Sequence, residues 1–273
     1  MRKILVSVFD DERTAFEGLT ALKDLHHDGD ITLYASAVIV KDANGVTSVR
    51  DSEDRGPVGT AVGVVAGALV GLVAGPVGAV VGAYVGGVGG LAYDLFAVGV
   101  GSDFIRDTSA ELTAGKSAVV AEIDESWVTP VETRIGDLGG VTFRKIPNEV
   151  IDEQVSREAT LAKAELEHLR EEFRQTTGAA RTKVEKAIDA QRQKLAALDA
   201  RIKTTLEQET AAYQARLATL EAQQAKVRED KKAAIAARIA ALKADFAERK
   251  AKLERARELT TEAHALTKEA VRP

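Results

Sequence analysis

The chain contains no cysteine, which excludes disulfides, thiolate nucleophiles and cysteine-ligated metal sites. Proline is scarce, with 5 in 273 residues, and that length allows one or two domains. Charge is divided unevenly: residues 1–147 hold 12 Lys/Arg against 20 Asp/Glu, and residues 148–273 hold 25 against 22. The net charge is therefore −8 before Asn148 and +3 from there on. The amino terminus turns acidic at Asp10, too soon for a signal peptide, so we expect the globular part in the cytoplasm.

Residues 56–93 contain no charged side chain and hold 12 of the 22 glycines. Glycine recurs at every fourth residue in two series, separated by Pro76. Because residues four apart share one face of a helix, each series predicts a helix with a groove free of side chains. Each glycine costs a helix about 1 kcal/mol relative to alanine, and close approach between helices is the usual compensation. This glycine zipper, our candidate for oligomerisation and membrane insertion, consists of Gly59, Gly63, Gly67, Gly71, Gly75, Gly78, Gly82, Gly86 and Gly90.

Two interpretations of the zipper remain open. Residues 57–74 and 76–93 would each span about 27 Å as a helix, close to the roughly 30 Å of a hydrocarbon core. The first interpretation is a hairpin inserted in a membrane, with both termini on the cytoplasmic side. The second is a Gly/Ala/Val-rich hairpin buried in a soluble assembly, since few Leu and no Ile or Phe make insertion of an isolated arm marginal. Both interpretations predict self-association.

The residues flanking the zipper predict an α+β fold. β-branched runs and turn residues predict the strands, and apolar residues at helical spacing predict the helices. The order is strand, helix, strand, strand, zipper, helix, strand, helix, strand, which is a ferredoxin-like plan with one added helix and strand. The expected strands are 4–9, 31–41, 46–50, 116–123 and 141–146, and the expected helices are 11–27, 103–114 and 127–138.

Several of these pieces resemble a bacterial family. They are Ile4-Leu5-Val6, the zipper, and the block from Ala121 to Pro130, which contains an acidic cluster and Trp127, followed by Gly139-Gly140. Together they resemble a membrane-protein domain family of unknown function over about residues 1–147. The resemblance implies a cytoplasmic ferredoxin-like domain interrupted by a membrane-seeking hairpin, and it supplies no catalytic residues.

After Pro147 the sequence departs from that pattern and predicts a long helical arm. Residues 149–272 contain no proline and one glycine, Gly178, where the arm can fold back. Apolar residues recur every eleven positions, as in Val184, Leu195, Leu206 and Leu217. This repeat predicts a nearly straight, coiled-coil-like rod, and residues 179–270 as one helix would reach about 138 Å. Its thin core favours packing against neighbouring copies, and a solvated spacer helix is the alternative.

Side chains suited to catalysis or metal binding are not arranged in a convincing pattern. The four histidines, at positions 26, 27, 168 and 264, lack metal-ligand spacing, so we expect them on the surface and expect no metal or cofactor. Glu122, Asp124 and Glu125 could act as acid and base or bind a cation. A strand-end cluster that caps the next helix is the commoner arrangement, and we prefer it. Basic residues of the arm alternate with acids and lack aromatic partners, so nucleic-acid binding is not expected.

The sequence thus predicts a ferredoxin-like domain (1–55 and 94–147), a zipper hairpin (56–93) and a helical arm (148–273). The first functional hypothesis is a non-enzymatic scaffold that self-associates at the cytoplasmic side of a membrane. Its partners would be further copies, lipid and a protein bound by the arm. The alternatives are a soluble or peripheral module that binds a small ligand or ion, and an oligomeric membrane pore.

Overall fold

The structure is a computed structural model of residues 1–273, and it describes residues 2–53, 59–73, 100–147 and 150–270. The chain divides into two compact units. Met1–Asn148 and Ala212–Leu242 form the first, and Glu149–Ala211 and Lys243–Pro273 form the second. The first unit therefore combines the predicted α+β region with part of the predicted arm. The boundaries of the predicted domains stay a prediction.

The elements follow the order expected from the sequence. The strands are β1 (Arg2–Phe9), β2 (Ile31–Lys41), β3 (Thr47–Glu53), β4 (Ser117–Glu125) and β5 (Val141–Lys145). The helices before the arm are α1 (Glu12–His27), α2 (Gly59–Val73), α5 (Ser102–Glu111) and α6 (Thr129–Asp137). The five strands form one antiparallel sheet in the order β3-β2-β4-β1-β5. The α+β class is confirmed, and the ferredoxin-like description stays a prediction.

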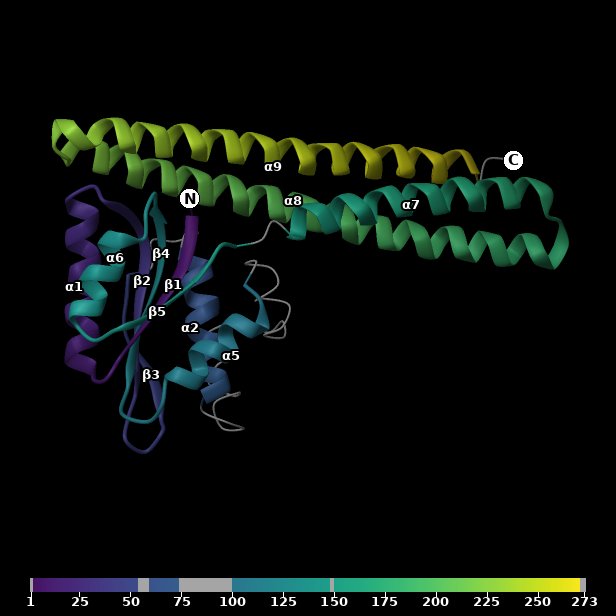
Figure 1. Ribbon diagram of the computed structural model, residues 1–273. Coiled ribbons are helices and arrows are strands. Elements are labelled where there is room, and N and C mark those ends of the chain that lie inside the picture. Colours follow the sequence, from purple (N-terminus) through teal and green to yellow (C-terminus); the bar gives the residue numbers. More distant parts are fainter. Residues whose placement is uncertain (1, 54–58, 74–99, 148–149, 271–273) are drawn as a thin grey trace. The chain divides into compact units, whose positions relative to one another are not determined.

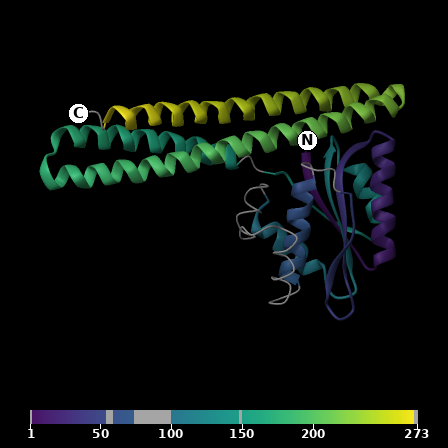
Figure 2. The same ribbon diagram turned by 180° about the vertical axis from the view of Figure 1, so that it is seen from behind.

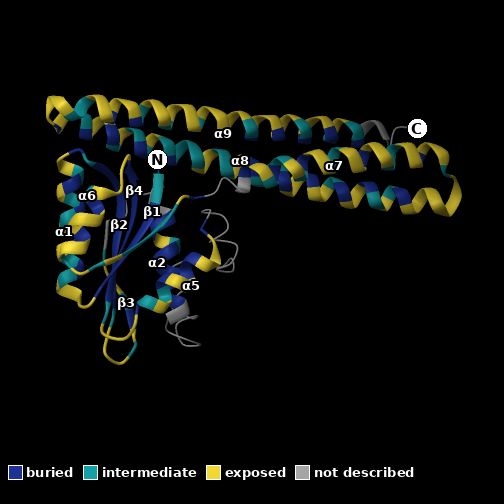
Figure 3. Cartoon of the chain, in the orientation of Figure 1, coloured by how far each residue is buried: buried dark blue, intermediate teal, exposed yellow. Residues whose placement is uncertain are grey.

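Helices cover both faces of the sheet. Figures 1 and 2 show α1 and α6 on one face and α2 and α5 on the other. Leu19 and Leu22 of α1 pack against sheet residues such as Ile123, and fully burying a leucine contributes about 1.5–3 kcal/mol. Figure 3 shows the central strands buried, while the outer side of α1 is exposed. A sheet buried on both faces explains why β2 is a nearly continuous apolar run.

The first zipper arm forms α2, which packs on the sheet of its own chain. Val62, Val65 and Leu69 join the core that includes Ile4 and Val120. The apolar side chains of α2 are therefore buried against the sheet of the same chain. Neither interpretation of the sequence predicted this arrangement. Within the described ranges, no helix combines the length and the apolar character needed to cross a membrane.

The arm contains three helices: α7 (Val150–Gln175), α8 (Gly178–Lys226) and α9 (Glu229–Ala270). The chain folds back at Gly178, whose φ of +59° lies in the left-handed region that favours glycine. A second reversal at Val227-Arg228 separates α8 from α9, so the prediction of one helix over residues 179–270 is wrong. No glycine or proline marks this turn. Val227 is buried there, and Arg228 pairs with Asp230 in the first turn of α9.

The second unit is a bundle of α7 with parts of α8 and α9. Val184 and Leu195, from one row of the eleven-residue repeat, are buried in it together with Leu166. Its interior also holds an ion pair, in which Arg249 Nε donates to Asp152 Oδ2 at 2.7 Å. Arg249 Nη2 donates to Glu209 at 2.7 Å. Burial lowers the pKa of Arg249, but the two carboxylates raise it by more, so the guanidinium stays charged.

Candidate functional site

The most elaborate polar site of the first unit lies where residues 212–242, which we call the arm tip, contact the α1–β2 turn. We call the contact the arm-docking site. It consists of Gly29, Asp30, Thr32 and Glu122 on the sheet side and Arg216, Gln223, Lys231 and Arg238 on the arm tip.

The α1–β2 turn presents backbone acceptors because a helix ends there. The Asp30 N–H donates to Leu25 O at 3.0 Å and the Gly29 N–H donates to His26 O at 3.1 Å, a Schellman arrangement with glycine at the left-handed position. The last carbonyls of a helix lack intrahelical partners and need others. In this turn, the partners of the carbonyls are side chains of the arm tip, which lies far along the chain.

Gln223 of α8 joins three groups of the turn. Its Nε2 donates to His26 O at 2.6 Å and to Ile31 O at 2.7 Å. Its Oε1 accepts from Thr32 Oγ1 at 2.6 Å. Gln223 is 3% exposed, so its amide forms these hydrogen bonds almost entirely out of contact with water. The donors and acceptor of one side chain thereby fix the position of α8 against the turn.

Arg238 of α9 binds the same turn from the other helix. Its Nη2 donates to Asp30 O at 2.6 Å, and its Nη1 donates to Gly29 O at 3.3 Å and to Thr32 Oγ1 at 3.2 Å. Burial lowers the pKa of this guanidinium, although Asp124 acts in the opposite direction. A cation beside carbonyls at the carboxyl end of α1 also opposes the helix dipole. Lys231 Nζ adds an ion pair with Asp30 Oδ1 at 2.6 Å.

Glycine is required at position 29 for two reasons. Its φ is +82°, and a Cβ built there would lie 3.1 Å from both Lys231 Cβ and Val227 Cγ1. Any side chain would therefore strain the turn and press against the arm tip. The close approach of the turn and the arm tip depends on this residue.

The acidic cluster predicted near Trp127 is divided between the two faces of the sheet. Glu122, which is fully buried, accepts from Arg216 Nε at 2.8 Å, and its Oε2 has no hydrogen-bond partner in the described part of the chain. Glu125 accepts from Lys3 at 2.9 Å and from Arg144 at 2.8 Å. The preferred interpretation, capping of the next helix, is wrong: the cap of α6 is Val128, which makes no side-chain cap bond. Successive strand residues point to opposite faces, which separates Glu122 from Glu125.

The rest of the docking contact is apolar. Leu220, Val227 and Ile235 of the arm tip are buried in the same core as Ile4 and Tyr34. Burial raises the pKa of Tyr34, and the nearby Asp124 raises it further, so its phenol stays neutral well above pH 10. The hydrogen bonds thus fix how the arm tip is aligned with the sheet side, and burial of the apolar side chains stabilises the contact.

Charge also favours docking. The arm tip holds 6 Lys/Arg against 3 Asp/Glu, a net charge of +3, while residues 1–147 carry −8. The remainder of the arm holds 19 of each sign. The whole positive excess of the arm therefore lies in the segment that meets the acidic region.

The zipper glycines are only partly described. Gly63 is exposed on α2, and Gly67 and Gly71 are buried. A Cβ at Gly63 or Gly67 would meet no atom of the described residues within 4 Å, so their partner in close packing is not among those residues. The backbone of Gly59 begins α2. Five of the predicted zipper positions lie outside the described residues, namely Gly75, Gly78, Gly82, Gly86 and Gly90.

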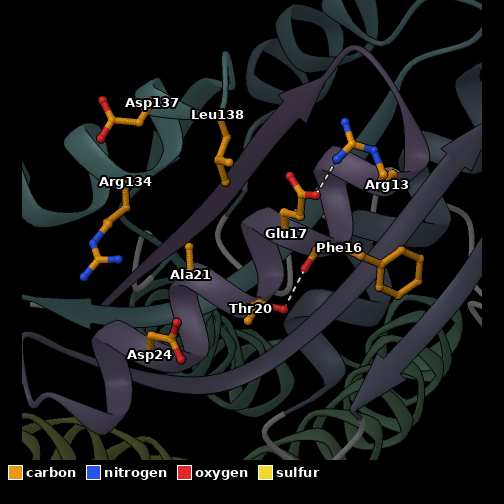
Figure 4. Close-up of a pocket in the computed structure, with 9 residues that line it drawn as sticks. All are labelled: Arg13, Phe16, Glu17, Thr20, Ala21, Asp24, Arg134, Asp137 and Leu138. Carbon is orange, nitrogen blue, oxygen red and sulfur yellow. Dashed lines mark hydrogen bonds and ion pairs between the residues drawn. The ribbon is translucent and has the colours of Figure 1, made fainter.

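A second feature, on the opposite face, is an open groove of about 640 Å³ between α1 and α6 (Figure 4). Phe16, Ala21 and Leu138 supply its apolar surface. Its charged side chains come from both helices and are Arg13, Glu17, Asp24, Arg134 and Asp137. Arg13 pairs with Glu17 at 2.7 Å along α1, which leaves charges of both signs to line the remainder of the groove.

In the described ranges, no three or more His, Cys, Asp or Glu side chains lie together in a group that could hold a metal ion. Among the histidines, His26 differs from the expected surface role. It is half-buried, and its Nδ1 accepts a hydrogen bond from the Leu33 N–H at 3.2 Å.

Sequence reasoning missed the docking residues Gln223 and Arg238. Two signals were present: the positive excess of residues 212–242, and five consecutive charged residues from Arg228 to Lys232, which interrupt the apolar repeat. Neither signal identifies the partner, since the turn lies about 190 residues away in the chain.

Comparisons with curated proteins and with solved structures find no match. The family comparison finds a match that begins at α2 and ends within α7, so it starts later and extends further than the resemblance expected from the sequence. A domain of the family described as "Protein of unknown function (DUF1269)" is found over residues 60–173 of this chain.

Proposed function

We propose that this chain is a non-enzymatic, self-assembling scaffold whose sheet domain holds a helical arm by its tip. The observation that carries the proposal is the arm-docking site, where Gln223 and Arg238 satisfy carbonyls of the α1–β2 turn. Such contacts fix a geometry and perform no reaction. A helical hairpin whose tip is fastened to a folded domain suits a protein that spaces or joins other molecules.

Self-assembly is the part of the proposal that the zipper supports. Gly63 is exposed, and a Cβ there would meet no described atom within 4 Å, so a side-chain-free surface on α2 is open to another helix. Arm residues add exposed charged pairs such as Lys250 with Glu254, which suit lateral contacts between copies. Association with the cytoplasmic side of a membrane, through uncharged residues 56–93, completes the proposal.

Light scattering on the full chain tests self-assembly. We expect Gly63→Leu to reduce the particle mass, because a leucine at this exposed position would fill the surface that a neighbouring helix needs. Gly136→Leu is the matched control, since Gly136 is an exposed helical glycine of α6 with no described atom near its Cβ. A monomeric wild type, or equal masses for all three proteins, would refute self-assembly through the zipper. Flotation with carbonate-washed vesicles tests membrane association separately.

The groove between α1 and α6 favours a second candidate, a module that binds a small ligand. Arg134 and Asp137 on α6 and Asp24 on α1 offer charges of both signs beside an apolar floor, which suits a zwitterion. A thermal-shift screen with free amino acids tests it. Stabilisation of the wild type that is lost in Arg134→Ala and kept in the exposed control Arg106→Ala would support binding, and no shift with any amino acid would refute it.

A further inference from the structure

The turn between β2 and β3 contains a reactive dipeptide that the proposed function does not use. Asn44 is exposed, and Gly45 follows it with a φ of +83°, in the left-handed region (Figure 3). The turn is a three-residue hairpin loop, in which the Gly45 N–H donates to Asp42 O at 3.0 Å and the Asp42 N–H donates to Val46 O at 2.9 Å. A Cβ at Gly45 would meet no described atom within 4 Å, so the space beside this peptide is open.

An asparagine that precedes glycine can lose its side-chain amide without an enzyme. The Gly45 nitrogen gives its proton to hydroxide and attacks the side-chain carbonyl carbon of Asn44, and the amide nitrogen takes up a proton and leaves as ammonia. The product is a cyclic imide. Water then opens either of the imide C–N bonds, which gives aspartate or isoaspartate, so the net change is uptake of water and release of ammonia. Glycine favours the attack because no Cβ shields its nitrogen.

Asp42 holds the turn in a form that resists this reaction. Its Oδ1 accepts from the Asn44 N–H at 2.9 Å and from the Val46 N–H at 2.8 Å. Its backbone oxygen accepts from the Gly45 N–H, which belongs to the nitrogen that must attack. Ring closure rotates the peptide between Asn44 and Gly45 and takes this N–H away from Asp42. The reaction therefore requires local opening of the turn, and the bonds to Asp42 determine how often the turn opens.

We propose that Asn44 is a site of spontaneous deamidation in the folded protein and that Asp42 limits its rate. The reaction adds a negative charge to the turn, and the isoaspartate form adds a carbon to the main chain before Gly45. The bond from Gly45 to Asp42 can then no longer form in its present geometry. The Gly115 N–H also donates to Asp42 O, at 3.2 Å, so the change reaches the connection between α5 and β4. The modified fraction grows with the age of the chain.

Peptide mapping of the full chain measures the reaction. Trypsin cleaves after lysine and arginine and so releases residues 42–50, whose asparagine, aspartate and isoaspartate forms are separated by chromatography and identified by mass. It also releases residues 146–157, which contain the only other asparagine of the sequence, Asn148. This asparagine is the internal control, because the side chain of Glu149 shields the nitrogen that would attack. After incubation at pH 8.0 we expect products at Asn44 and far less at Asn148.

Asp42→Ala tests the second part of the proposal. It removes both bonds to Oδ1, which water replaces in part, so we expect the rate at Asn44 to rise about fivefold, the equivalent of one net hydrogen bond. Asp103→Ala is the matched control and should keep the parent rate, since it removes an exposed carboxylate that pairs with Arg106 on α5. Gly45→Ala should suppress the product even though it strains the turn, because the methyl group shields the attacking nitrogen.

The contrary results are equally specific. Absence of product at Asn44 in the folded chain, or equal rates at Asn44 and Asn148, would overturn the proposed site. An unchanged rate in Asp42→Ala, or an equal rise in Asp103→Ala, would overturn the role of Asp42. Undiminished product in Gly45→Ala would overturn attack by the Gly45 nitrogen.

Discussion

Removal of the Gln223 amide should weaken the arm-docking site more than any other single truncation of a neutral side chain in the arm tip. Gln223→Ala deletes three hydrogen bonds of 2.6–2.7 Å between buried or half-buried groups. Two of the partners keep another bond, because His26 O still accepts from Gly29 and Thr32 Oγ1 from Arg238. A net hydrogen bond contributes about 0.5–1.5 kcal/mol, so the loss should be about 2–3 kcal/mol. This corresponds to an equilibrium constant for opening of the arm-docking site that is about 30- to 150-fold larger.

The chain has no cysteine, so Val227→Cys introduces one thiol at a buried position of the arm tip beside Gly29. Its labelling rate with a pyridyl disulfide at pH 8.0, divided by the rate of the unfolded chain, gives the equilibrium constant for opening of the arm-docking site. Gln224→Ala is the matched control: it removes the same amide one residue further along α8, from a half-buried position. We expect its opening constant to stay within about twofold of the parent, in keeping with surface substitutions. A change below about threefold for Gln223→Ala, or an equal change for Gln224→Ala, would show that Gln223 does not fasten the arm tip.

Two further substitutions and one pH dependence test the packing and the charges of the two units. Gly29→Ala should destabilise the first unit by at least about 1–3 kcal/mol in urea unfolding, because a Cβ meets the arm tip at φ +82°. Arg249→Met should cost the second unit about 3–5 kcal/mol, because Asp152 is left charged and buried. Above pH 10, stability should fall with rising pH, because the folded state raises the pKa of Tyr34 and binds a proton that the unfolded chain releases.

Each of these three predictions has a control that isolates its cause. Gly45→Ala shares the left-handed backbone, with φ +83°, but has no described atom within 4 Å of its Cβ, so an equal loss would exclude the arm contact as the cause. Arg255→Met removes an exposed pair with Glu258 and should leave the melting temperature unchanged. Tyr34→Phe should remove part of the alkaline loss, and an unchanged pH profile would contradict the assignment to Tyr34.

Local patterns were sufficient for the α+β elements. The strand at Ile31–Lys41 and the helix ending at His27 were predicted at their observed bounds or within a residue, because apolar spacing and capping residues are local signals. The eleven-residue repeat likewise predicted helices with buried rows. It could not reveal the turn at Val227-Arg228, since good helix formers continue through it and burial of Val227 against the sheet domain favours the turn.

The sequence by itself determined the order of helices and strands, the lack of thiol chemistry, and the concentration of positive charge in the arm tip. Only the tertiary structure decided that α2 packs on its own sheet and that Gln223 and Arg238 hold the end of α1. The physical reason is that periodicity states which face of an element is buried but not what covers it. The covering groups here come from segments up to about 200 residues apart, and nothing local to either segment specifies the other.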